Sequence, residues 1–138
     1  MKIIICGSIS AGDEIVKVRK ELLAKGNEVE IPEGVKRPEI RAKVNASQEE
    51  KADIKVKYNL IKGYYNKMKK FDIVLIVNPQ LKGVKGYIGR NTFLEMGFAH
   101  VLGKKLYCLY PLPQMPYLSE LLAMKPVILS RKLERIRI

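Results

Sequence analysis

The architecture is indicated most directly by the segment Lys2-Ile3-Ile4-Ile5-Cys6-Gly7-Ser8-Ile9-Ser10-Ala11-Gly12. After Lys2 its first half is continuously apolar, as is typical of a parallel strand buried on both faces. The small residues that follow predict a tight turn into a helix, with Ser10 or Asp13 as its N-cap. We therefore expect residues 2–6 to be a central strand whose carboxyl end meets the turn 7–12.

Strand-like and helix-like segments alternate along the rest of the chain. Further strands are expected at 28–32, 72–77, 105–110 and 127–129, and helices at 13–25, 47–70, 91–103 and 117–123. Such alternation predicts an α/β fold with helices on both faces of a parallel sheet. We expect a three-layer, flavodoxin-like, doubly wound sheet of five strands in the order 2-1-3-4-5, formed by one domain over 1–138. The charged stretch 33–45 is a candidate mobile loop or lid, and 130–138 a final helix or a loose tail.

Charge is the main feature of the composition. The chain has 138 residues, with 26 Lys and Arg against 14 acids, for a net charge of +12. One interpretation is an anionic ligand, either a nucleotide or a nucleic acid. The other is a solvated surface rich in charges, as in heat-adapted (thermophilic) proteins. Aromatic residues are not interleaved with the basic ones, which makes a nucleic-acid partner the weaker expectation.

The cysteines, the single histidine and the length of the apolar runs bear on whether the chain holds disulfides, a metal site or a membrane span. Cys6 and Cys108 lie in strand-like segments and are expected to be buried thiols, which fits a reducing, cytoplasmic location. His100 is the single histidine and has no cluster of metal ligands around it, so we expect neither a metal nor a cofactor. No apolar run reaches the ~18 residues of a membrane span.

The strand order places two candidate motifs at one crevice. The loops after strands 1 and 3 lie at the switch point of the sheet, where α/β proteins bind ligands. There Glu95 is expected in the first turn of helix 91–103, either complementing the helix dipole or attacking an anomeric carbon. Four small or short residues around it are expected to leave room for a ligand: Gly89, Thr92, Gly97 and Ala99. The turn 7–12 is either a phosphate-binding loop or a turn that needs small residues for steric reasons.

These motifs resemble the nucleoside 2-deoxyribosyltransferase family, and most of all its deoxynucleoside 5′-monophosphate N-glycosidases. The similarity covers roughly residues 3–123, whereas 32–62 show no visible match. It rests on three segments in the same order: Cys6 to Gly12, Asp72 to Val77, and Thr92 to Ala99 followed by Gly103-Lys104-Lys105.

The resemblance implies roles for individual residues. Glu95 would be the nucleophile that attacks C1′ of the sugar, and Ser8 to Gly12 would hold a 5′-phosphate. Ser119 would reach the phosphate of a neighbouring subunit's site, which implies a homodimer; alternatively it is an ordinary helix cap. The full set of expected substrate-binding residues is Gly7, Ser8, Ile9, Ser10, Gly12, Gly89, Asn91, Thr92 and Ser119.

The sequence also departs from the family at two catalytic positions. A supporting tyrosine would fall near Ile4, and an aspartate that serves the leaving base would fall near Gly63 or Tyr64. Tyr64, Tyr87 and Asn91 are the candidates to donate a proton or hydrogen bonds instead. The first hypothesis is therefore hydrolysis or transfer of the N-glycosidic bond of a small-molecule nucleotide or nucleoside. The alternatives are a non-catalytic nucleotide-binding protein of the same fold and a basic nucleic-acid-binding domain.

Overall fold

A five-stranded, fully parallel sheet forms the centre of the molecule. The computed structural model describes residues 1–137. The strands are β1 (Lys2–Cys6), β2 (Glu28–Glu30), β3 (Ile73–Ile76), β4 (Lys105–Cys108) and β5 (Val127–Ile128). Their order is β2-β1-β3-β4-β5, with Ile3 of β1 paired with Ile73 of β3, and Ile73 with Lys105 of β4. The predicted α/β class, parallel sheet and strand order are thus confirmed.

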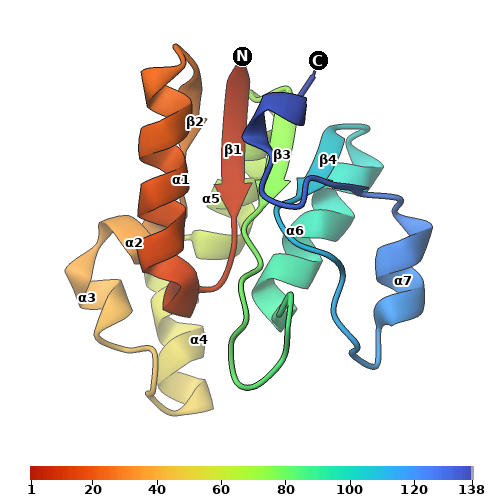
Figure 1. Cartoon of the computed structure of the whole chain (residues 1–138). Coiled ribbons are helices and arrows are strands. Elements are labelled where there is room, and N and C mark those ends of the chain that lie inside the picture. The colour runs from red at the N-terminus through yellow and green to blue at the C-terminus, as the bar shows by residue number, and fades with distance from the viewer. Residues whose placement is uncertain (138) are drawn as a thin grey trace.

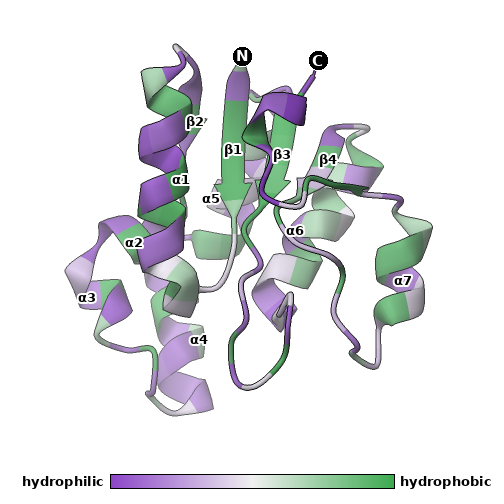
Figure 2. Ribbon diagram, viewed as in Figure 1, coloured by the Kyte–Doolittle hydropathy of each residue, from purple (hydrophilic) through white to green (hydrophobic). Residues whose placement is uncertain are grey.

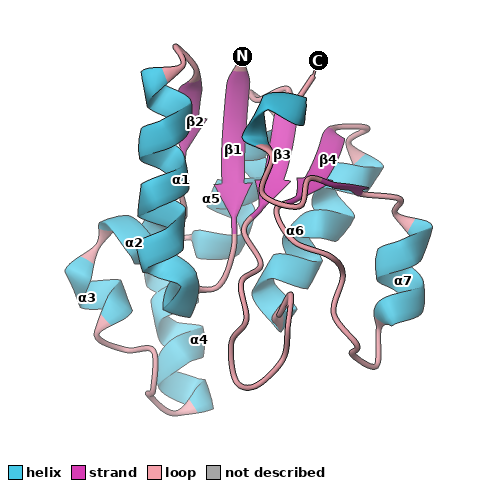
Figure 3. Ribbon diagram, viewed as in Figure 1, coloured by secondary structure: helices cyan, strands magenta, loops and turns pink. Residues whose placement is uncertain are grey.

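Helices of different lengths connect these strands, as Figure 3 shows. The α-helices are α1 (Gly12–Ala24), α2 (Glu33–Lys36), α3 (Pro38–Arg41), α4 (Gln48–Lys57), α5 (Leu60–Met68), α6 (Arg90–Val101) and α7 (Leu118–Ala123). Short 3-10 helices occur at η1 (Ile9–Ala11) and η2 (Leu133–Arg135).

Alternate strand residues face two separate hydrophobic clusters, which makes the fold three-layered. One cluster joins Ile3, Ile5 and Leu75 to α1 and to η2. The other joins Ile4, Cys6 and their neighbours in β3 and β4 to α5, α6 and α7. Figure 1 shows α1 on one side of the sheet and α5 and α6 on the other, and in Figure 2 β3, and β1 after Lys2, are continuously apolar. Burial on both faces explains why β1 and β3 are continuous apolar runs.

The helix expected at 47–70 is in fact broken in two. Ser47 caps α4, accepting a hydrogen bond from the Glu50 N–H at 3.2 Å. At Asn59, however, the backbone enters the left-handed region (φ 50°), which ends one helix and starts another. Asparagine tolerates this conformation better than most residues. The break changes the direction of α4 relative to α5.

The stretch 33–45, expected to be a mobile loop or lid, contains two short helices. Val35 of α2 and Ile40 of α3 are buried, and Gly34 packs directly against Ile9. Glu33 hydrogen-bonds Lys67 of α5 and Arg37, which lowers its carboxyl pKa to about 2. These contacts hold the segment against the sheet edge. The tail expected at 130–138 contains η2, with Leu133 and Ile136 buried; residue 138 lies outside the described residues.

The structure also bears on the expected helix cap, the two cysteines and the absence of a membrane span. Ser8 caps η1, and neither Ser10 nor Asp13 caps α1. Cys6 and Cys108 are buried free thiols, as expected. Among the described residues, none of the helices is both long and apolar enough to cross a membrane.

Candidate functional site

A cavity of about 730 Å³ opens at the carboxyl edge of the sheet. Its walls come from the loop after β1, from α2 to α5, from the loop 79–89, from α6, and from residues 115–117. In Figure 1 these segments surround the ends of the strand arrows. The loops after β1 and β3 therefore meet at one cavity, as the strand order predicts.

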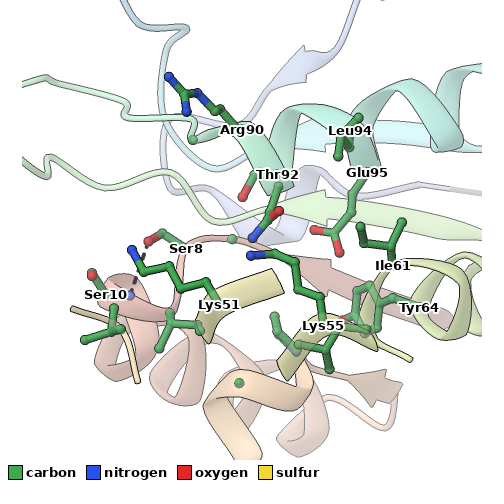
Figure 4. Close-up of a pocket in the computed structure, with 18 of the residues that line it drawn as sticks. Ser8, Ser10, Lys51, Lys55, Ile61, Tyr64, Arg90, Thr92, Leu94 and Glu95 are labelled. Atoms are coloured by element: carbon green, nitrogen blue, oxygen red, sulfur yellow. Dashed lines mark hydrogen bonds between the residues drawn. The ribbon is translucent and has the colours of Figure 1, made fainter. Parts of the chain in front are cut away.

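Glu95 projects into this cavity from α6, as Figure 4 shows. Because α6 begins at Arg90, Glu95 lies in the second helical turn and not in the first, so the expected position is wrong by one turn. Burial raises the pKa of its carboxyl to about 8. A hydrogen bond with the Cys6 thiol acts in the opposite direction and favours the carboxylate. A glutamate with such a pKa is a recognised feature of functional sites.

Cys6 and Tyr64 lie next to Glu95. Cys6 is the last residue of β1, and burial beside Glu95 raises the pKa of its thiol. Tyr64 of α5 is also buried, and its hydroxyl donates a hydrogen bond to the Ile5 carbonyl oxygen. Tyr64 therefore lines the cavity as predicted, but its hydroxyl proton is already engaged by the backbone. This arrangement makes Tyr64 a support for the end of β1 rather than a free proton donor.

The loop 7–12 forms one end of the cavity. Gly7, Ser8, Ile9 and Ser10 line it, whereas Gly12 does not. Ser8 accepts a hydrogen bond from the Ser10 N–H at 3.2 Å. At Gly7 a steric requirement is visible, because an added Cβ would lie 2.8 Å from the Val77 carbonyl oxygen. The steric explanation for small residues thus applies to Gly7, and the serine hydroxyls remain as candidate ligand donors.

The opposite wall is formed by the start of α6 and the loop before it. Tyr87, Gly89, Asn91 and Thr92 all line the cavity, as predicted. The Tyr87 hydroxyl accepts a 3.5 Å hydrogen bond from Lys82. Gly97 and Ala99 do not line the cavity, and Ala99 is buried in the core, so neither makes room for a ligand.

Ser119 lies outside the cavity of its own chain. It is exposed near the start of α7, and its hydroxyl donates to Glu120 at 3.0 Å. The helix has Tyr117 at its N-cap position with no side-chain cap, so the interpretation of Ser119 as a cap is wrong. Its expected contact with a second subunit remains a prediction.

Sequence reasoning missed two groups of residues at this edge. Asn78, fully buried after β3, donates to the carbonyl oxygens of Gly86 (3.3 Å) and Tyr110 (3.0 Å) and accepts from the Tyr110 N–H (3.0 Å). It therefore joins the loops that follow β3 and β4. The second group is Lys51 and Lys55, which enter the cavity from α4. The sequence did contain a signal for this pair, since a spacing of four residues in a helix places both lysines on one face.

Comparison of the chain with family models, with curated protein sequences and with solved structures finds no match to any of them.

Proposed function

We propose that this protein cleaves the N-glycosidic bond of a nucleoside 5′-monophosphate, with Glu95 as the nucleophile. The observation that carries the proposal is a glutamate of pKa about 8 in a large cavity whose other walls supply hydroxyls and cations. The resemblance to deoxynucleoside monophosphate N-glycosidases supports the same reaction, and the cations favour a phosphorylated substrate over a neutral nucleoside.

The chemistry follows from the position of the carboxylate. The ionised Glu95 attacks C1′ of the sugar, a C1′–O bond forms, and the electron pair of the C1′–N bond leaves with the base. The base takes up a proton as it leaves. Tyr87 is the best-placed donor among the predicted candidates, because its hydroxyl lies in the cavity beside the Lys82 ammonium. Water or a second base then attacks C1′ and regenerates the carboxylate.

A second candidate function is nucleotide binding without turnover. It is favoured by the contacts of Glu33, the other carboxylate that lines the cavity. Glu33 accepts hydrogen bonds from Lys67 and Arg37. Among the described lining residues no second free carboxylic acid is therefore present to protonate the leaving base. General acid catalysis is worth about 10²–10⁴-fold, so its absence is a substantial handicap for hydrolysis.

Release of free base tests the proposal directly. The protein is incubated with ribo- and deoxyribonucleoside 5′-monophosphates, with and without a second base, and the bases are separated by chromatography. We expect base release that Glu95→Gln abolishes and that Glu28→Gln, an exposed glutamate on β2, leaves unchanged. Base release that persists in Glu95→Gln would overturn the assigned nucleophile. Binding without release from any nucleotide would favour the second candidate.

A further inference from the structure

Helix α4 contributes an unusual wall to the cavity. None of its residues is buried, yet Ile54, Lys51 and Lys55 line the cavity. In Figure 4 the Lys51 side chain extends toward Ser8 and Ser10, and Lys55 extends into the space in front of Thr92 and Glu95. The two lysines are four residues apart and so occupy the same helix face. This face is directed at the loop 7–12 and not at solvent alone.

Neither ammonium group is paired within the chain. Across residues 1–137, Lys51 and Lys55 make no ion pair and no side-chain hydrogen bond. Other lysines near the cavity do have partners: Lys67 and Lys36 bind Glu33, and Lys43 lies 3.9 Å from Glu50. Lys51 and Lys55 are therefore cations of the cavity wall whose charge the protein leaves uncompensated.

The acids of the cavity do not compensate that charge either. Glu33 is neutralised by ion pairs with Lys67 and Arg37. Glu95 is largely protonated at pH 7, because its carboxyl pKa is about 8. A concave site with uncompensated cations concentrates the field and attracts anions. The cavity is thus electropositive around Lys51 and Lys55 in the resting protein.

We propose that Lys51 is the residue by which this cavity selects phosphorylated over unphosphorylated nucleosides. The inference rests on the proposed function for the identity of the substrate. Lys51 supplies an ammonium on the α4 side, and Ser8 and Ser10 supply hydroxyls on the opposite side, so that a phosphate group is held between them. Charge-assisted hydrogen bonds of this kind are the strong ones in protein–phosphate recognition.

The break at Asn59 accounts for the position of this lysine. Residues 47–70 have the helical pattern of one long helix, but the left-handed Asn59 redirects α4 away from the line of α5. Helix α5 is anchored by Met68 and Tyr64 in the core, whereas α4 is free to extend beside the cavity. The break therefore places Lys51 beside the loop 7–12, on a helix that contains no buried residue.

Equilibrium binding separates this inference from the proposed function. All variants carry Glu95→Gln, which prevents turnover and has the charge of protonated Glu95. Calorimetry then compares the four common deoxynucleoside 5′-monophosphates with their nucleosides. We expect Lys51→Gln to weaken monophosphate binding about 10- to 100-fold, the range for one charged hydrogen bond, and to change nucleoside binding less than about 2-fold. Lys57→Gln makes the same charge change on α4 outside the cavity and should alter neither.

Each outcome supports or overturns the inference by itself. Equal effects of Lys51→Gln on both ligand types, no effect on either, or absence of monophosphate binding before the lysine is changed would each overturn it. If the wild type binds monophosphates through Lys51 but releases no base, the proposed function fails and this inference stands. If base is released but Lys51→Gln retains the full preference for monophosphates, this inference fails and the proposed function stands.

Discussion

Replacing Glu95 with glutamine is expected to stabilise the protein at alkaline pH. Burial raises the pKa of the Glu95 carboxyl from 4.5, the value expected in the unfolded chain, to about 8 in the folded one. Between these two values the folded state holds a proton that the unfolded state has lost. The free energy of unfolding therefore falls as pH rises, and the stability present below pH 4.5 is lost by the time pH passes 8.

The size of this effect follows from the two pKa values. One pKa unit corresponds to about 1.36 kcal/mol, so the shift of Glu95 lowers the free energy of unfolding by about 4 kcal/mol between pH 5 and pH 9. Glutamine has nearly the shape of the protonated acid and does not ionise. The variant should thus equal the wild type within about 1 kcal/mol at pH 5 and exceed it by about 4 kcal/mol at pH 9.

Urea unfolding at a series of pH values measures this difference. The midpoint should separate for the two proteins as pH rises, with the slope m unchanged. The contributions of the other titrating groups to the free energy of unfolding cancel when the wild type is subtracted from the variant. The control Glu28→Gln should follow the wild type at every pH, because Glu28 is exposed. Parallel curves for Glu95→Gln and wild type, or a variant less stable at pH 9, would refute the raised pKa of the Glu95 carboxyl.

Two further predictions concern the reaction and the loops around it. Since only the ionised carboxylate attacks C1′, kcat/KM for base release should rise about tenfold per pH unit below 7 and level off near pH 8; a flat profile would contradict this. Gly86→Ala should destabilise the protein by more than about 2 kcal/mol in thermal unfolding, because Gly86 has φ +70° and the new Cβ would lie 2.2 Å from the Pro111 carbonyl oxygen. Gly83→Ala has a similar φ, +72°, but no atom within 4 Å, so it should cost only about 1 kcal/mol; equal losses would exclude the clash as the cause.

The sheet was predictable because its signal is local and redundant. β1 and β3 are continuous apolar segments buried on both faces, and few other elements produce that pattern. The order of the strands was expected from the alternation of strands and helices, which is typical of a doubly wound parallel sheet. The convergence of the loop 7–12 and Glu95 at one edge was a consequence of that order, and both line the cavity.

The rest of the site depended on features that periodicity does not encode. The break at Asn59 is a single backbone angle within a segment of helical pattern, so α4 and its lysines were assigned to one long helix. The stretch 33–45 lacks helical periodicity because each of its two helices is only one turn long. The ion pair between Glu33 of α2 and Lys67 of α5 holds the stretch in place, and residues so far apart in the sequence give no local pattern. The contact of Cys6 with Glu95 joins residues 89 positions apart, which only the folded sheet brings together.

The hydrogen bonds of Asn78 give the cavity two mechanically different walls. By bonding to both Gly86 and Tyr110, this one side chain joins the loops 79–89 and 109–117 to each other and to the end of β3. The wall formed by α4 contains no buried residue, and elements with few buried contacts have low local stability. We therefore expect the wall joined by Asn78 to keep its shape when a ligand binds and the α4 wall to adapt. We expect the shape of the ligand to be selected at the first wall and its charge at the second.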